Sequence, residues 1–148
     1  MNRIDVEQLV SLWRARLGLQ TWEIEVVWPE DYARWPENEN KDDFTKFDGF
    51  DHARIWRAKD YENARLYVNP DKLETHETRS LEVDIVHELL HLVFRETEFI
   101  LDQIDGQLHR DVSDIVEKTF VHHMEASIDK LAYRLVDLVT APFSDSRL

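Results

Sequence analysis

The chain has 148 residues, of which 43% are hydrophobic and 11% aromatic, and these values favour a single globular domain, residues 1–148, with a hydrophobic core. The absence of cysteine excludes a disulfide framework, a thiolate metal site and a cysteine nucleophile, and it fits a reducing compartment. A formal net charge of -13 argues against a nucleic-acid partner, because affinity for phosphates comes largely from clustered lysine and arginine.

The first expected element is a helix over residues 4–18. Gly18 suits a left-handed C-cap, and the apolar face comprises Val6, Leu9, Val10, Trp13 and Leu17. These N-terminal residues mix charged and apolar positions and lack the continuous apolar run of a signal peptide, and no stretch approaches the length of a membrane span. We therefore expect a cytoplasmic protein with no membrane partner. Residues 21–28 then alternate apolar and acidic side chains, which predicts a strand with one buried face.

Residues 29–51 have no periodicity and include two prolines and a glycine, which predicts a long loop. Its aromatic residues favour packing against the body of the domain, and the loop could also cover a substrate cleft. Residues 52–57 and 64–69 predict a hairpin. Its second strand should turn one set of side chains inward, namely Ala64, Leu66 and Val68, and the alternate set outward, namely Arg65, Tyr67 and Asn69.

Residues 81–94 are apolar around the whole circumference of a helix, which predicts a central, buried one. Residues 96–110 are ambiguous and suggest a short helix broken at Gly106. A long helix is expected from about 111 to 139, followed by a frayed tail over residues 140–148. Its expected buried stripe comprises Val112, Val116, Phe120, Met124, Ile128, Leu131 and Leu135.

Three titratable residues interrupt the apolar run of the central helix. His87 and His91 are four residues apart, so both imidazoles project from one helical face, one turn apart, and can bind one ion. Glu88 lies about 100° around the axis from His87, outside the ligand set but near an open coordination position. Zn2+ suits such imidazoles and lowers the pKa of a bound water to about 7, and a nearby carboxylate can take its proton. The pattern HELLH therefore predicts a zinc site with Glu88 as general base.

The long helix carries the expected third ligand. The row through Val121, Glu125 and Ile128 is apolar except at the glutamate, so Glu125 should point toward the interior, where a carboxylate needs a cation. Asp129 follows one turn later and can accept a hydrogen bond from the second ring nitrogen of a zinc histidine. Asp84, one turn before His87, is an alternative for that contact.

These residues make the chain similar to the zincin metallopeptidases, in particular the small gluzincin-like domains of phages and bacteria. The resemblance depends on VHELLH, residues 86–91, after the strand over residues 64–69, and on EASIDKLA, residues 125–132, in a later helix. HExxH is the specific motif among these. In the gluzincin arrangement a later helix supplies a glutamate as third zinc ligand, and an aspartate four residues on supports a zinc histidine. Carried over, this implies Glu125 as the ligand and Asp129 as the supporting carboxylate.

The sequence departs from two branches of these enzymes. The metzincin motif would need glycine and histidine at positions that hold Phe94 and Thr97, so that branch is excluded. The tyrosine and histidine that polarise the substrate carbonyl in thermolysin-like enzymes have no obvious counterpart. The substitutes to consider for an oxyanion or substrate contact are His122, His123 and Tyr133, although packing or plain exposure explains each more simply. Positions 122 and 123 are offset from 125 by about 60° and 160°, which favours His122 over His123.

The resulting expectation is an α+β, zincin-like fold: a small, mostly antiparallel or mixed sheet packed on the HExxH helix, with an N-terminal helix and a long C-terminal helix. The expected function is a zinc metallopeptidase that hydrolyses a peptide or protein substrate. That substrate would pair as an extended strand with residues 64–69. The alternative is a catalytically silent, zinc-containing protein-binding module, against which the intact Glu88 counts. A DNA-associated repair protease is disfavoured by the net charge of -13.

Overall fold

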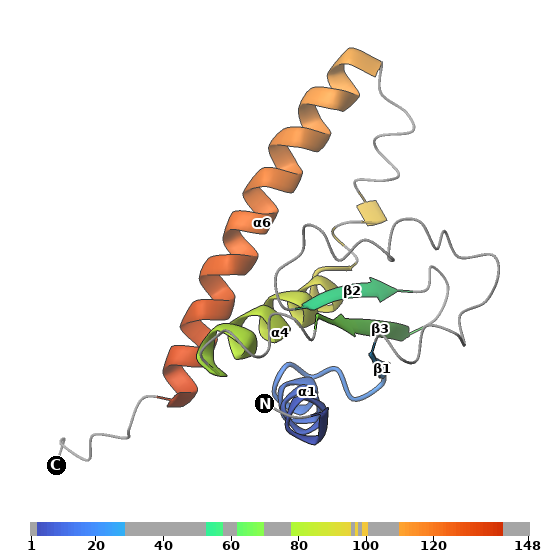
Figure 1. Ribbon diagram of the computed structural model, residues 1–148. Coiled ribbons are helices and arrows are strands. Elements are labelled where there is room, and N and C mark those ends of the chain that lie inside the picture. Colours follow the sequence, from blue (N-terminus) through green and yellow to red (C-terminus); the bar gives the residue numbers. More distant parts are fainter. Residues whose placement is uncertain are drawn as a thin grey trace, which may run out of the picture.

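The computed structural model describes residues 3–28, 53–57, 62–69, 78–95, 97, 99–100 and 110–140. Within these residues the chain is an α+β protein with three helices and one three-stranded sheet, as the sequence predicts (Figure 1). The elements in chain order are α1 (Arg3–Arg16), β1 (Glu23–Val27), β2 (Ala53–Arg57), β3 (Asn63–Val68), α4 (Thr78–Val93) and α6 (Arg110–Thr140). The expected loop 29–51, most of the segment 96–110 and the tail beyond residue 140 lie outside the described residues.

The sheet is mixed, and β3 is its central strand in the order β1-β3-β2. β2 and β3 pair in antiparallel register with Ile55 opposite Leu66, which confirms the pairing expected of the hairpin. β1 runs parallel to β3 on the other side, with Val26 opposite Leu66. The two edges of the described sheet are therefore β1 and β2, and β3 has no free edge.

The side chains of β3 are more buried than the sequence predicts. Ala64, Leu66 and Val68 are buried as expected, but Tyr67 is only 1% exposed and the following Asn69 only 2% exposed. The prediction that these two side chains point outward into solvent is wrong. Alternating polarity identifies a strand with one polar face only when that face is open, and a central strand can be covered on both faces.

Helix α1 packs its apolar face on the core through Val6, Val10 and Trp13. The helix ends at Arg16, and Gly18 follows with a φ of 74°, the left-handed conformation that glycine adopts without strain. The N–H of Leu19 then donates to the carbonyl of Arg14, which satisfies an orphan carbonyl at the helix end as in a Schellman cap. The indole N–H of Trp13 donates to Glu82 Oε1 over 2.7 Å and so connects α1 to α4.

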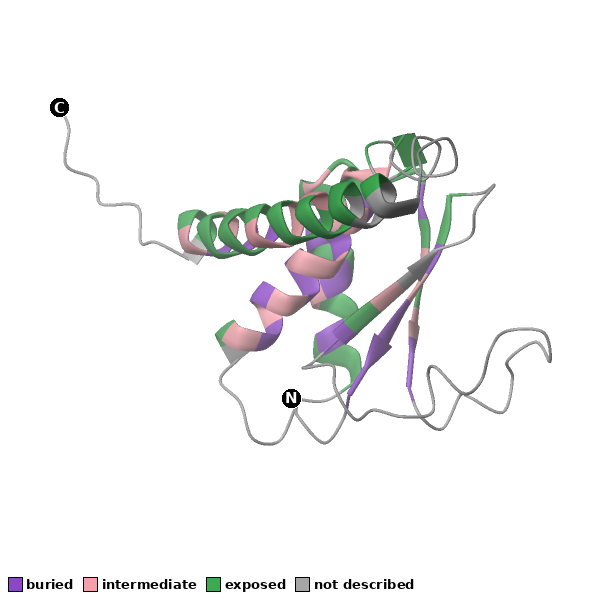
Figure 2. Cartoon of the chain, turned by 90° about the horizontal axis from the view of Figure 1, so that it is seen from above, coloured by how far each residue is buried: buried purple, intermediate pink, exposed green. Residues whose placement is uncertain are grey.

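Helix α4 lies in the middle of the molecule, packed against α1, β2 and α6 (Figures 1 and 2). This position confirms that a helix with apolar side chains around its whole circumference is central. Its buried side chains belong to the same core as those of α1 and the sheet, and they are Leu81, Val83, Ile85, Val86, Leu89, Leu90 and Leu92.

Helix α6 packs against α4 and buries mainly its C-terminal half, where Ile128, Ala132 and Val136 are at most 1% exposed. The expected buried stripe is correct at Ile128, and Met124 and Leu135 pack partly against the core. It is wrong at Val112, Val116 and Leu131, which are exposed. For Val112 and Val116 the reason is length: α6 has 31 residues and α4 has 16, so the N-terminal part of α6 extends past its partner (Figure 1). Leu131 lies about 100° around the helix from the buried Ala132, away from the contact with α4. Among the described helices, none combines the length and hydrophobicity that a membrane crossing requires.

Candidate metal site

Two histidines on one face of α4 form the base of the candidate site. The helical repeat places His91 one turn after His87, and their Nε2 atoms are 3.2 Å apart. The side chains are 18% and 17% exposed, so both rings are largely removed from solvent. Each ring stands against the other edge to face, with centroids 5.0 Å apart.

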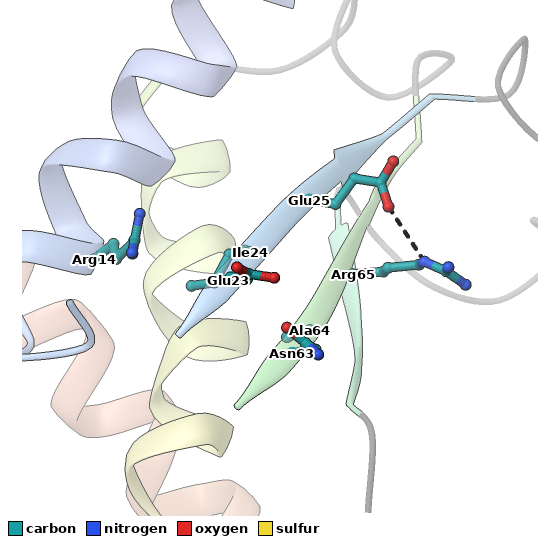
Figure 3. A pocket seen from close by; sticks show the side chains of 7 residues that line it. All are labelled: Arg14, Glu23, Ile24, Glu25, Asn63, Ala64 and Arg65. Atoms are coloured by element: carbon teal, nitrogen blue, oxygen red, sulfur yellow. Dashed lines mark hydrogen bonds and ion pairs between the residues drawn. The ribbon is translucent and has the colours of Figure 1, made fainter. Parts of the chain in front are cut away.

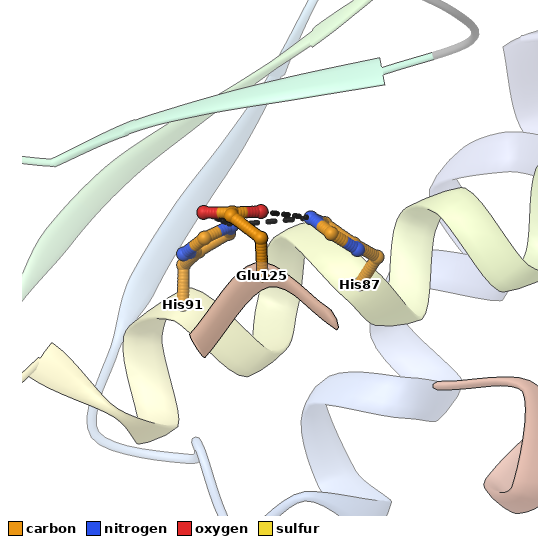
Figure 4. A group of neighbouring side chains, drawn as sticks. All are labelled: His87, His91 and Glu125. Atoms are coloured by element: carbon orange, nitrogen blue, oxygen red, sulfur yellow. Dashed lines mark hydrogen bonds and ion pairs between the residues drawn. The ribbon is translucent and has the colours of Figure 1, made fainter. Parts of the chain in front are cut away.

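Glu125 reaches the two histidines from α6, as Figure 4 shows. Its Oε2 atom lies 3.3 Å from His87 Nε2, and its Oε1 atom lies 3.7 Å from His91 Nε2. The Glu125 side chain is 42% exposed, so it lies at the rim of the α4–α6 contact rather than in the interior that the apolar row predicts. One ligand atom from each of the three residues lies within 4.8 Å of the others.

The donor set fits a small divalent cation. Two imidazole nitrogens and a carboxylate oxygen converge, and atoms that carry lone pairs do not gather this closely unless a proton or a cation lies between them. Bonds of 2.0–2.2 Å to a tetrahedral zinc ion place neighbouring ligand atoms about 3.3–3.6 Å apart. The two Nε2 atoms are 3.2 Å apart, close to this value, and each lies 3.3 or 3.7 Å from a different oxygen of Glu125. His87, His91 and Glu125 could therefore hold zinc, with the carboxylate of Glu125 binding through one or both of its oxygens.

Asp129 contacts the far side of the His87 ring. Its Oδ1 atom lies 2.8 Å from His87 Nδ1, one helical turn after Glu125 on α6. A carboxylate at this position favours the proton on Nδ1 and leaves Nε2 with the lone pair that a metal needs. Asp84, the alternative for this contact, is half-buried on α4, but the partner of Nδ1 is Asp129.

Glu88 follows His87 on α4 but does not belong to the group of three potential ligands. Its Oε2 atom accepts a hydrogen bond of 2.6 Å from the backbone N–H of Ile55 in β2. Burial raises the pKa of this carboxyl, and Glu125 raises it further, whereas His91, the Ile55 N–H and His87 act in the opposite direction. Desolvation is the dominant cause, so Glu88 binds a proton more tightly than an exposed glutamate does.

The other candidates on α6 are exposed. His122 and His123 contact each other edge to face, with ring centroids 5.8 Å apart, and both are exposed. Tyr133 is 55% exposed. Among the described contacts, none joins these side chains to His87, His91 or Glu125.

The structure overturns one expectation about substrate pairing and adds one group to the site. The strand over residues 64–69 cannot accept a further strand, because β1 and β2 occupy both of its edges. The edge strand that packs on α4 is β2. Sequence reasoning also misses Ile55, because a backbone N–H leaves no signature in the side-chain pattern. The sequence offers one indirect signal: residues 52–57 are predicted to pair with residues 64–69, the strand that precedes the HExxH helix.

A separate pocket of about 540 Å³ opens beside β1 (Figure 3). It shares no lining residue with the candidate metal site. Its lining combines charged, polar and apolar groups and comprises Arg14, Glu23, Ile24, Glu25, Asn63, Ala64 and Arg65. Arg65 pairs with Glu25 at 3.3 Å, and Arg14 donates to the carbonyls of Leu19 and Gln20. None of these residues comes from α4 or α6.

Comparison of the chain with protein-family models, with curated proteins and with solved structures found no match. Any inference about function therefore depends on the chemistry of the residues at the α4–α6 crossing.

Proposed function

We propose that the chain is a zinc-dependent metallopeptidase with a zincin-like arrangement. The observation that carries this proposal is the convergence of His87, His91 and Glu125 within 4.8 Å, with Glu88 beside them but outside the group. Two imidazoles and a carboxylate are the donor set of catalytic zinc sites that leave one coordination position open. A bound zinc ion would supply Lewis-acid chemistry, which polarises a carbonyl and lowers the pKa of water to about 7.

Glu88 takes the role of general base in this proposal. Its carboxylate would accept a proton from the attacking water and deliver it to the leaving amine of the peptide bond. The raised pKa, caused mainly by burial, makes this carboxylate a better proton acceptor than an exposed one. Its position one residue after His87 keeps it close to the donor group without competing for the metal.

Asp129 takes the role of a positioning residue for His87. The 2.8 Å contact with Nδ1 holds the imidazole in the tautomer that presents an Nε2 lone pair toward His91 and Glu125. The carboxylate therefore supports the metal site without contacting the ion.

The proposed substrate is an extended peptide that lies along the outer edge of β2, where Glu88 already accepts from the Ile55 N–H and the peptide would pair with the other main-chain groups of this edge. Within the described sheet β2 pairs with β3 only, and it packs against α4, the helix that carries His87 and His91. Main-chain hydrogen bonds along a sheet edge bind extended peptides with little dependence on sequence. This placement replaces the strand 64–69 that the sequence favours.

The test is Glu88→Gln, assayed on a fluorogenic peptide library with zinc content measured in parallel. We expect hydrolysis to fall by at least about 100-fold with zinc retained, because the change removes a base and not a ligand. Glu23→Gln, an exposed glutamate on β1, is the matched control for loss of one carboxylate.

Two outcomes would contradict this proposal. Loss of zinc from Glu88→Gln would place Glu88 among the ligands. Stoichiometric zinc without hydrolysis of any library peptide by the parent protein would favour the alternative, a zinc-containing module that binds proteins without cleaving them.

A further inference from the structure

The backbone N–H of Ile55 points away from its sheet partner and toward α4. In an antiparallel pair, alternate residues direct their N–H and C=O groups to the neighbouring strand and to the opposite side. The Ile55 N–H donates to Glu88 Oε2 over 2.6 Å, so residue 55 belongs to the set that faces away from β3. Ala53 and Arg57 share this set, because they lie two residues away on the same strand.

This hydrogen bond fixes one of the two carboxylate oxygens of Glu88. An N–H that donates to a carboxylate forms a short, charge-assisted bond, and the 2.6 Å separation lies at the short end for such a bond. Among the described hydrogen bonds, the other oxygen of Glu88 has none. Strand β2 therefore holds Oε2 and leaves Oε1 for a different task.

We infer that the Ile55 backbone N–H is a positioning group for Glu88 and orients the carboxylate for proton transfer. The inference rests on the proposed function. It means that strand β2, and not only helix α4, determines the orientation of the Glu88 carboxylate. A group fixed by a neighbouring strand loses rotamer freedom before the reaction, which lowers the cost of reaching a reactive geometry. The same contact makes the base sensitive to any displacement of β2.

The first test needs no activity and measures amide hydrogen exchange by NMR in the metal-free protein. We expect the Ile55 amide to exchange at least about 10-fold faster in Glu88→Ala than in the parent, because its acceptor is lost. The amide of Arg57, on the same side of β2, and that of Leu66 in β3 should keep their parental rates. Unchanged exchange at Ile55 would overturn the inference, as would a general increase at all three amides, which would report loosening of the sheet.

The second test compares three variants of β2 by kcat, KM and zinc content. Ile55→Pro removes the N–H but no hydrogen bond between strands, because that N–H faces away from β3. Edge strands tolerate proline at such positions. Arg57→Pro introduces the same ring two residues along the same side. Ile55→Ala keeps the N–H and removes most of the side chain, so it separates the two contributions of residue 55.

We expect kcat of Ile55→Pro to be about 10- to 100-fold below that of either comparison variant, with KM within about threefold and zinc retained. Equal kcat in Ile55→Pro and Arg57→Pro would overturn the inference while leaving the peptidase proposal intact. If the parent itself hydrolyses nothing, the peptidase proposal fails, and the exchange measurement still decides whether Ile55 holds Glu88. Should Ile55→Pro fail to fold, the exchange measurement on Glu88→Ala decides alone.

Discussion

Two pairs of histidines lie near Glu125, and their surroundings differ. One pair, His87 and His91, lies on the neighbouring helix α4, and the other, His122 and His123, lies on α6 itself. His87 and His91 are less than one-fifth exposed, and their Nε2 atoms lie 3.2 Å apart against the Glu125 carboxylate. His122 and His123 precede Glu125 by only three and two residues, yet both are exposed and contact each other. Proximity in sequence therefore does not decide which histidines meet the glutamate.

Helical geometry explains the contrast. Residues four apart project from the same face of a helix, whereas adjacent residues are about 100° apart around the axis. The first pair also lies where α4 and α6 cross, so carboxylates from the second helix reach both ring nitrogens of His87. The second pair lies on the solvent side of α6. A pair of histidines becomes a candidate metal site when spacing, burial and carboxylate partners coincide.

The largest difference between the pairs should appear in zinc content after single alanine substitutions. We expect His91→Ala and Glu125→Ala to lose zinc, because a site with two remaining protein ligands binds a cation far more weakly. His123→Ala should retain one equivalent, as the parent does. Metal analysis after incubation with zinc and removal of excess distinguishes these outcomes. Full zinc content in Glu125→Ala together with loss in His122→Ala would instead indicate a three-histidine site.

A smaller effect is expected from the carboxylate behind His87. Asp129→Asn keeps the size of the side chain but weakens the 2.8 Å contact with Nδ1, and zinc affinity should fall by about 10- to 100-fold. Asp137→Asn is the matched control, because Asp137 lies two turns further along α6 and pairs with Arg79. Competition with a chromophoric chelator measures both affinities. Equal affinities in the two variants would mean that Asp129 does not support the metal site.

The sequence predicts the part of the site that lies on one helix. It predicts only in part the contacts that depend on how helices and strands pack against each other. HELLH fixes the relative positions of His87, Glu88 and His91, because all three lie on one helix. The apolar row on α6 singles out Glu125, but it overestimates the burial of that side chain, which lies at the rim. The Ile55 contact depends on how β2 packs against α4, and no local pattern encodes it.

The fold shows the same division between local and long-range information. The existence and type of each described helix and strand follow from periodicity. The parallel pairing of β1 with β3 does not, because it joins segments about forty residues apart. Periodicity also does not predict the exposure of Val112 and Val116 near the start of α6, since it reports which positions are apolar and not how far the partner helix extends. Val112 and Val116 fit the helical repeat but lie beyond the part of α6 that α4 covers.

A pH-dependent effect separates Glu88 from an ordinary exposed glutamate. Its pKa is raised, mainly by burial, above the ordinary value of 4.5, so the folded protein binds its proton more tightly than the unfolded chain. The free energy of unfolding contributed by this group therefore falls as pH rises from about that value through the raised pKa. In metal-free protein, Glu88→Gln should be more stable than the parent near neutral pH, and the gap should close as pH falls. Urea unfolding at several pH values measures the stability of the parent, of Glu88→Gln and of the exposed-site control Glu23→Gln. A difference between Glu88→Gln and the parent that does not change with pH would contradict the prediction.

The smallest effect should come from the exposed histidines, and it gives the comparison its sharpest control. In the double variant His122→Ala and His123→Ala, the free energy of unfolding without metal should stay within about 0.5 kcal/mol of the parent, because neither ring packs in the core. Zinc at 100 times its dissociation constant should stabilise parent and double variant alike by about 2.7 kcal/mol, since a ligand that binds only the folded state adds stability by mass action. His87→Ala, treated identically, should gain almost nothing from zinc. If zinc did not increase the free energy of unfolding of the double variant, His122 or His123 would contribute to the metal site. The distinction between the two pairs would then be wrong.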